Sequence, residues 1–256
     1  MKIHVYTICW NEEKMLPFFI RHYQQFADKI IFFDNESTDN SRAIIESSDR
    51  CVYRSYSSGN EIRDDLYREV KNNAWKESRG EADFVIVVDA DEMLYSKYNL
   101  RTYFKLLKLF GFTLIKPFGY DMVAEQVDWS TNKQITELVT IGQAFKPMCK
   151  PCVFNPNKIE EINYGFGAHS CRASGKIRSF RADWLTKHLD MGLYLLHYKR
   201  MGVDYITERH SHLKQRLSAF NKQKKLGFHY ETSADDIRKE YEGYRAKSYT
   251  VIKHRI

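Results

Sequence analysis

Long apolar runs are missing from this sequence. No stretch approaches the roughly 20 apolar residues that a helix needs to cross a bilayer, and residues 1–10 (MKIHVYTICW) show no signal-peptide pattern. There is also no internal repeat and no low-complexity linker. We therefore expect a cytoplasmic globular protein, not a membrane-spanning, secreted or repeat protein.

Cysteines are also few. Five of them, an odd number, are scattered along 256 residues, which argues against a disulfide framework and fits a reducing compartment. Cys149 and Cys152 form a C-x-x-C, but no second such pair and no spaced histidine pair accompanies them. A zinc site is therefore not favoured, and we interpret these as loop cysteines.

The positive charge is unevenly distributed. Residues 1–196 hold 26 Lys and Arg against 26 Asp and Glu, whereas residues 197–256 hold 14 against 7, so the whole net charge of +7 lies in the last 60 residues. Such a basic segment attracts phosphates, nucleic acid or an anionic membrane. A solvated helix face explains the same charges equally well.

Apolar segments alternate with helical patterns through the first half of the chain. Strands are predicted at 2–9, 29–34, 51–56, 84–89 and 112–118, and helical spacing follows Asn11, a suitable N-cap, and covers 61–79. This alternation predicts an α/β fold with a doubly wound, mostly parallel sheet. Residues 119–196 lose the pattern, and helical spacing returns over 203–226.

Polar residues collect where these strands end. Asn11 and Asp34 follow the first two strands, and Asp89 and Asp91 follow the fourth. Ligands of such sheets bind at the carboxyl ends of the strands. Because Asp89 and Asp91 are two residues apart in an extended chain, they share a face, and oxygen ligands select Mn²⁺ or Mg²⁺. Such an ion commonly holds phosphate oxygens too, which suggests a diphosphate substrate.

The chain resembles family-2 glycosyltransferases with the GT-A fold. TICWNEEKMLPFFIRHY, IIFFDNESTDNS and FVIVVDADEML carry the resemblance as the blocks W-N-E, D-N-x-S-T-D and D-A-D-E, and GFGAHS and LLHYK extend it. It implies a nucleotide-sugar donor, with Asp89 and Asp91 as the family's D-x-D at the ribose and the metal-bound diphosphate. It also implies that the base and ribose lie near Thr7, Asn11 and Asp34, the phosphates near Arg63 and Arg68, and the metal at Asp89, Asp91 and His197.

The expected catalytic base has no clear counterpart here. Inverting members need a group that takes the proton from the acceptor hydroxyl, and many carry an Asp in a late Glu-Asp pair that this sequence lacks. The candidates are Asp121, Glu125, Asp128, Asp183 and His169. We select Asp121, because it follows the fifth predicted strand, and His169, because it lies in a glycine-rich loop.

The resemblance implies a metal-dependent, hexosyltransferase-like enzyme that is inverting. It would move a sugar from a UDP- or GDP-sugar to a glycan or lipid-linked acceptor in surface polysaccharide or glycoconjugate synthesis. We expect a glycosyltransferase domain at 1–196, divided into a donor half (1–118) and an acceptor half (119–196), and a basic helical extension at 197–256. Peripheral contact with an anionic membrane is an expectation for this extension, through Lys222, Lys224 and Lys225 with Tyr241, Tyr244 and Tyr249.

Two alternatives remain at this stage. A haloacid-dehalogenase-type phosphatase also uses D-x-D after a buried strand, but it has Thr or Val where this chain has Met93, and its motif follows the first strand. A basic nucleic-acid-binding module would use the C-terminal charges, but no such motif occurs and the acidic strand ends would be unexplained. No nucleic-acid partner is therefore expected.

Overall fold

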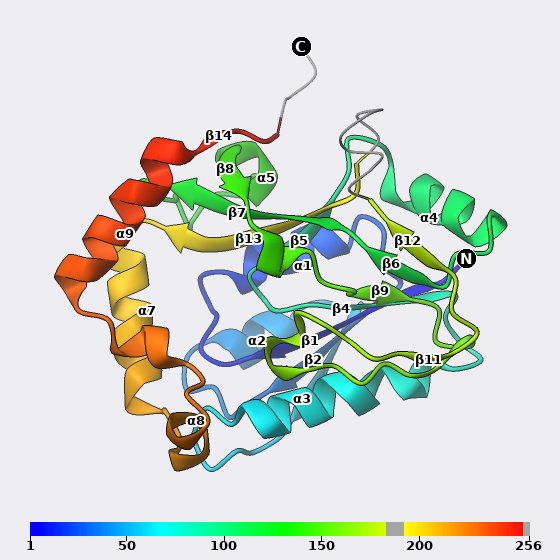
Figure 1. The fold of residues 1–256 in the computed structure, drawn as a ribbon, viewed down its shortest axis with the longest axis horizontal. Coiled ribbons are helices and arrows are strands. Elements are labelled where there is room, and N and C mark those ends of the chain that lie inside the picture. The colour runs from blue at the N-terminus through cyan, green and yellow to red at the C-terminus, as the bar shows by residue number, and fades with distance from the viewer. Residues whose placement is uncertain (183–191, 253–256) are drawn as a thin grey trace.

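The computed structural model describes residues 1–182 and 192–252 as a mixed α/β fold (Figure 1). Among these residues the larger sheet has seven strands, in the order β12-β6-β9-β4-β1-β2-β3. Their bounds are Ser179–Arg181, Leu114–Lys116, Val153–Phe154, Phe84–Val87, Ile3–Cys9, Lys29–Asp34 and Cys51–Ser55, respectively. All neighbours pair in parallel except β9, which is antiparallel to β4 and β6. The predicted α/β fold with a mostly parallel sheet is confirmed.

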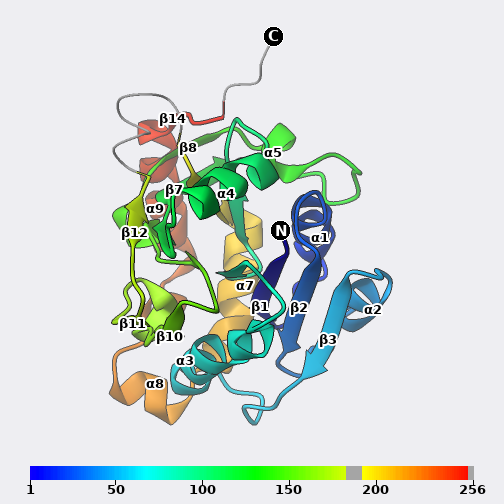
Figure 2. The ribbon, with the colours of Figure 1, turned by 90° about the vertical axis from the view of Figure 1, so that its right-hand side faces the viewer.

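Both faces of this sheet are covered, because residues two apart on its strands point to the same face. Ile3 and Val5 of β1 pack in one core cluster with Phe19 of α1 (Leu16–Tyr23). Tyr6 packs in the other with Trp75 of η1 (Ala74–Ser78). Figure 2 shows α1 and α2 (Ser41–Glu46) on the opposite side of the strands from α3 (Asp64–Asn73). This double cover explains why the strands are apolar without alternation.

The first helix does not start at Asn11, as predicted. Its N-cap is Met15, and Pro17 lies in its first turn, where a missing N–H costs nothing. Asn11 has a φ of 49°, which Asn tolerates, and its amide hydrogen-bonds Thr38. Asn11 therefore stabilises the turn after β1 and caps no helix.

The predicted strand at 112–118 is wrong as a single element. The chain leaves β6 at Lys116 and begins β7 (Phe118–Ala124) in a different sheet. The intervening Pro117 has no N–H to donate to a strand ladder, which accounts for the break. The second sheet, which the sequence did not predict, has the order β14-β8-β7-β13-β5. The bounds of the other four strands are Tyr249–Thr250, Ile141–Ala144, Tyr194–Met201 and Glu92–Tyr95.

This second sheet brings distant acidic and basic residues together. His197 of β13 pairs with Asp121 of β7 on one side and with Glu92 of β5 on the other. β5 begins directly after the D-A-D segment, so Asp91 is carried to the same place. The register of β13 against β7 shifts between His197 and Arg200, a bulge that re-aims side chains locally.

The C-terminal segment is a set of helices, not one long pattern. The helical spacing predicted over 203–226 divides into α7 (Val203–Gln215) and α8 (Ala219–Gln223), because Ser218 caps α8 through its hydroxyl. η4 (Phe228–Glu231) and α9 (Ala234–Lys247) follow. Figure 1 shows α7, α8 and α9 along one flank of the molecule. The boundary predicted at residue 196 falls inside β13, and the division into domain and extension stays a prediction.

The remaining helices, strands and 3₁₀ turns complete the description. These are α4 (Leu100–Leu109), α5 (Ile135–Leu138), η2 (Lys146–Met148), β10 (Ile159–Glu161), η3 (Phe166–Ala168) and β11 (Ser174–Gly175). In the part of the chain that the structure describes, no helix combines the length and apolar character needed to cross a bilayer.

Candidate active site

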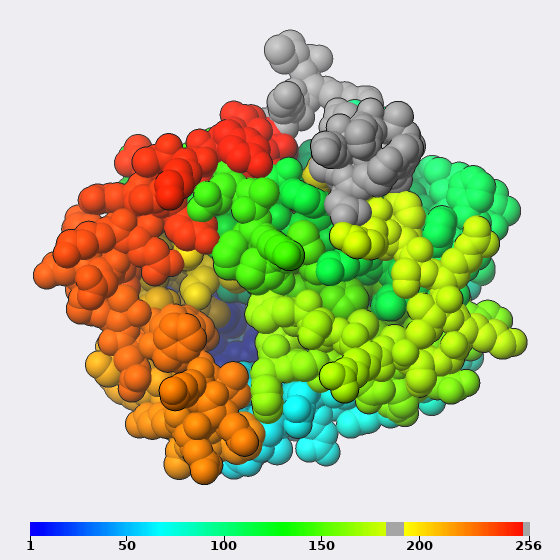
Figure 3. All heavy atoms as spheres, viewed as in Figure 1, coloured from blue at the N-terminus to red at the C-terminus, as the bar shows by residue number. Residues whose placement is uncertain are grey.

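A cleft of about 640 Å³ opens beside the carboxyl ends of β1 and β4. Residues from α3, the loops at 145–150 and 165–169, β13, α7 and the segment 225–230 line it. Figure 3 shows this hollow between the orange C-terminal segment and a yellow-green segment, with blue N-terminal atoms at its floor. Six of the ten predicted site residues line the cleft: Arg68, Asp89, Asp91, Asp121, His169 and His197.

Asp89 is engaged by two lysines that the sequence did not single out. One carboxylate oxygen accepts from Lys71, and the other accepts from Lys150 at 3.1 Å. Lys150 is buried and also forms an ion pair with the buried Glu92. Burial would raise the pKa of Asp89, but the charges of Lys71 and Lys150 outweigh it and hold the pKa below its usual value. These contacts favour the role of a positioned anion for Asp89 over that of a metal ligand.

Asp91 faces His197 instead. The His197 Nε2 atom lies 3.5 Å from Asp91 Oδ2, and Nδ1 lies 2.7 Å from Asp121 Oδ1. Burial would lower the pKa of His197, but Asp91 and then Asp121 raise it to about 10. A carboxylate that accepts from Nδ1–H fixes the ring, and a metal at Nε2 would replace the second ring proton, as is usual for histidine ligands.

These residues fit a divalent cation with few protein ligands. Asp91 and His197 offer an oxygen and a nitrogen to one point, and Mg²⁺ or Mn²⁺ sites commonly take their remaining ligands from phosphate and water. Within residues 1–182 and 192–252 no group of three or more His, Cys, Asp or Glu has the geometry of a complete metal site. The geometry thus matches an ion shared with a substrate.

Asp121 differs from its prediction as a catalytic base. It is 1% exposed, its carboxylate accepts from His197, and Arg200 lies 3.8 Å away. Because its carboxylate is nearly fully buried and engaged by His197, its geometry is that of a residue that positions His197.

His169 keeps the geometry of a base. Its Nδ1–H donates to the Pro147 carbonyl at 2.8 Å, which leaves the lone pair on Nε2. Burial and the charge of Lys150 lower its pKa, so the ring is neutral at neutral pH. Gly167 has a φ of +67°, and a Cβ there would lie 2.7 Å from His169 Nε2, so glycine is required beneath this ring.

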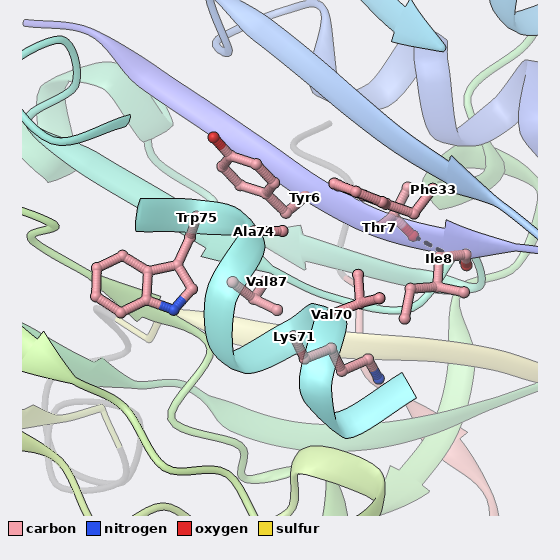
Figure 4. A pocket seen from close by; sticks show the side chains of 9 residues that line it. All are labelled: Tyr6, Thr7, Ile8, Phe33, Val70, Lys71, Ala74, Trp75 and Val87. Carbon is pink, nitrogen blue, oxygen red and sulfur yellow. Dashed lines mark hydrogen bonds between the residues drawn. The ribbon is translucent and has the colours of Figure 1, made fainter. Parts of the chain in front are cut away.

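Four predicted site residues do not line the cleft. Thr7 lies in a separate apolar cavity of about 10 Å³ under α3, which holds at most one water (Figure 4). Asp34 is 1% exposed and accepts hydrogen bonds from Ser37 and Tyr53. Arg63 forms two hydrogen bonds with Asp65. Asp34, Arg63 and Asn11 thus make local contacts within turns and at a helix start, a role that strand-end position alone does not distinguish from binding.

The remaining candidates for the catalytic base are not found in the cleft either. Glu125 is exposed and pairs with Arg245, and Asp128 is exposed and caps the turn at Ser130. Neither lines the cleft, and Asp183 lies outside the described residues.

An ion pair between residues far apart in the sequence was also not predicted. Arg209 of α7 forms a 2.5 Å ion pair with the buried Glu12 and lies 3.8 Å from Asp91. Burial raises the pKa of Glu12, although Arg209 opposes the shift. The W-N-E block marked Glu12, but nothing in the sequence pairs it with a residue almost 200 positions later.

Trp10 and Arg216 form a second unpredicted pair. The guanidinium carbon of Arg216 lies 3.6 Å from the centre of a Trp10 ring, and Arg216 Nε donates to the Asn60 carbonyl. Both terminal nitrogens of Arg216 and the Trp10 Nε1 atom are buried with no hydrogen-bond partner. Buried donors of this kind are rare unless a ligand satisfies them, and both side chains line the cleft.

One known protein family matches part of the chain. Residues 4–108, less than half of the chain, match the family described as "Glycosyl transferase family 2". The resemblance found in the sequence is confirmed over this range. No curated protein matches the chain.

Solved structures are similar only at a distance. Glucosyl-3-phosphoglycerate synthase from Mycobacterium tuberculosis, in complex with Mn²⁺, UDP and glucosyl-3-phosphoglycerate, is 18% identical with a TM-score of 0.30. The match covers 46% of this chain and 44% of that one, less than half its length. A mycobacterial protein is 16% identical with a TM-score of 0.37, and the match covers 77% of this chain and 65% of that one. A 4-diphosphocytidyl-2C-methyl-D-erythritol synthase is 11% identical with a TM-score of 0.34, over 61% of this chain and 76% of its own.

Proposed function

We propose that the protein is a metal-dependent glycosyltransferase that moves a sugar from a nucleoside diphosphate sugar to an acceptor hydroxyl. The observation that carries the proposal is the Asp91–His197–Asp121 arrangement at the edge of the cleft. The family match over residues 4–108 supports it independently.

Asp91 and His197 would hold Mn²⁺ or Mg²⁺, with Asp121 fixing the imidazole. When bound, the ion neutralises negative charge on the departing diphosphate. Asp89, oriented by Lys71 and Lys150, would accept a hydrogen bond from a donor hydroxyl. A carboxylate already held by two cations is fixed in place and remains ionised across the physiological range.

Trp10 and Arg216 would contact the nucleotide. Their unpaired N–H groups can donate to carbonyl or phosphate oxygens of the donor, and the ring offers a face for stacking. Arg68 lies over Phe166, 4.4 Å from the ring centre, and lines the same cleft. It supplies a further positive charge for the phosphates.

His169 would act as the base. Its Nε2 takes the proton of the acceptor hydroxyl as that oxygen attacks the anomeric carbon, and the bond from that carbon to the diphosphate oxygen breaks. Both electrons of this bond leave with the diphosphate. Attack opposite to the leaving group gives an inverting transfer.

The same proposal names the substrates and the setting of the reaction. The donor is a UDP- or GDP-sugar, and the acceptor is a glycan or a lipid-linked molecule. The reaction belongs to surface polysaccharide or glycoconjugate synthesis in the cytoplasm. Peripheral membrane contact is part of the proposal too, through Lys222, Lys224 and Lys225. Phe228, 70% exposed, and Lys222 and Lys225 line a common surface hollow. A basic surface with an exposed aromatic suits a membrane interface.

The test is a donor screen that measures hydrolysis of UDP- and GDP-sugars with Mn²⁺, before and after chelation. We expect chelator-sensitive hydrolysis of at least one donor and its loss in Asp91→Asn, with normal activity in the matched control Asp128→Asn. Hydrolysis that survives both chelation and Asp91→Asn would contradict the metal assignment, and failure to bind any nucleoside diphosphate would contradict the function itself.

A further inference from the structure

A group of basic side chains on the C-terminal wall of the cleft lacks anionic partners. Lys199 of β13, His210 of α7 and His229 of η4 all line the cleft. Three other cations of the cleft differ, because Lys71, Lys150 and Arg209 each form an ion pair with an acid. Within residues 1–182 and 192–252, no carboxylate oxygen lies within 4 Å of Lys199 Nζ or of the ring nitrogens of His210 and His229.

His210 is the clearest sign of a missing partner. It is 7% exposed, yet both ring nitrogens are buried without a hydrogen bond. Its ring lies 6.0 Å from that of His229 and 5.4 Å from that of Tyr230, measured between centres. A buried imidazole normally has at least one partner, because leaving a buried polar group without a hydrogen bond is unfavourable.

A bulge in β13 brings Lys199 to the cleft wall. The bulge in β13 between His197 and Arg200 lets both Lys199 and Arg200 line the cleft, although consecutive strand residues normally point to opposite faces. Burial, then Lys199, lowers the pKa of His229, and burial, then Lys199 and Arg209, lowers the pKa of His210 to about 4. At neutral pH the two imidazoles are therefore uncharged, and they can donate N–H groups beside the positive charge of Lys199, which favours a bound anion.

We propose that Lys199, His210 and His229 form a subsite for a phosphate monoester carried by the acceptor. Three donors from separate elements that line one cleft suit a doubly charged group with three free oxygens better than the singly charged diester of a lipid headgroup. The assignment to the acceptor rests on the proposed function, in which Asp91, His197, Trp10 and Arg216 serve the donor. No member of the subsite comes from residues 4–108, the part that matches the family.

The experiment titrates inorganic phosphate into the protein at constant ionic strength, free and saturated with UDP and Mg²⁺, and follows binding by calorimetry. We expect phosphate to bind both forms and dimethyl phosphate to bind at least fivefold more weakly. Lys199→Met and His210→Asn should each weaken phosphate binding at least tenfold and change UDP affinity less than twofold. The matched control Lys158→Met, an exposed lysine that does not line the cleft, should bind phosphate like the wild type.

Three results would overturn the subsite: no phosphate binding by the wild type, competition between phosphate and UDP, or unchanged phosphate affinity in both Lys199→Met and His210→Asn. Equal affinity for dimethyl phosphate would overturn the monoester assignment. Melting temperatures of the variants separate a lost site from a lost fold, since the two substitutions affect different elements. Failure of the wild type to bind UDP contradicts only the proposed function, because the titration of the free protein still decides the subsite.

Discussion

At the residue scale, Lys150 shows how a single buried side chain can position two carboxylates beside the cleft. It is 3% exposed and lies between the carboxylates of Asp89 and Glu92. Burial raises the pKa of Glu92, so this acid depends on its partner to remain ionised. The C-K-P-C segment was notable in the sequence only for its cysteines, all of which are free. The partners of Lys150 are about 60 residues away in the chain, beyond the reach of local pattern.

We predict that Lys150→Met lowers the free energy of unfolding by about 3–5 kcal/mol, the usual cost of leaving a buried charge without its partner. Denaturant unfolding measures it, with the exposed Lys146→Met as the matched control. Adding Glu92→Gln to Lys150→Met should recover part of the loss, because it removes one of the orphaned charges. Equal stability of Lys150→Met and Lys146→Met would show that the ion pairs contribute little.

We predict that His169→Gln lowers kcat about 10²–10⁴-fold, the range of general-base catalysis, and leaves donor KM nearly unchanged. Gln keeps a hydrogen-bond donor for the Pro147 carbonyl but cannot take up the proton. Steady-state kinetics on the donor found by the screen decide this. The control is His212→Gln, an exposed histidine that does not line this cleft. A rise in KM with an unchanged kcat would assign His169 to binding instead.

At the element scale, the sequence was informative where an element is determined by its own residues. β1, β2 and β4 are apolar enough to be buried on both faces, and they were predicted within a few residues. The second sheet was not predictable, because β5, β7 and β13 are joined by pairings such as His197 with Asp121, 76 residues apart. Strand-end position predicted Asp89 and Asp91 in the cleft but could not separate them from Asp34, whose hydrogen bonds are turn-forming.

α1 is attached to this second sheet by a buried histidine. His22 Nε2 donates to the Leu94 carbonyl of β5 at 2.8 Å. Burial lowers the pKa of His22 to about 4, against 6.5 for the free side chain. Because the folded pKa is the lower one, the unfolded chain takes up the proton first as pH falls. His22 therefore contributes full stability above pH 6.5 and loses it progressively down to pH 4.

We predict that the wild type loses about 3 kcal/mol more stability than His22→Gln between pH 7 and pH 4, the equivalent of the 2.5-unit difference in pKa. Gln can keep the hydrogen bond to Leu94 without titrating in this range. The free energy of unfolding in denaturant, measured at several pH values for both proteins, checks it. Parallel pH profiles for the two proteins would show that His22 is protonated with its ordinary pKa in the folded state.

At the scale of the whole molecule, the C-terminal segment completes the cleft as one of its walls. Arg209 links α7 to Glu12 and Asp91, Ile62 bridges to Leu217, and Tyr241 of α9 donates to the Ala124 carbonyl. Part of the basic excess seen in the sequence is therefore directed inward, to the cleft. Of the tyrosines expected at a membrane, Tyr241 is buried and Tyr244 packs against Arg200, which leaves Tyr249 exposed.

What remains for a membrane is the segment from α8 to η4, of which Lys225 and Phe228 also line the cleft. Lys222, Lys224 and Lys225 are exposed there, beside the exposed Phe228. Each basic residue near an anionic bilayer contributes about 1 kcal/mol, so three give weak, salt-reversible binding. We predict that the protein sediments with anionic vesicles at low salt and that Lys222→Glu/Lys224→Glu/Lys225→Glu abolishes this. The control Lys105→Glu, at an exposed position of α4, should sediment like the wild type. Equal sedimentation of the triple variant and the wild type would show that these lysines only solvate their helix.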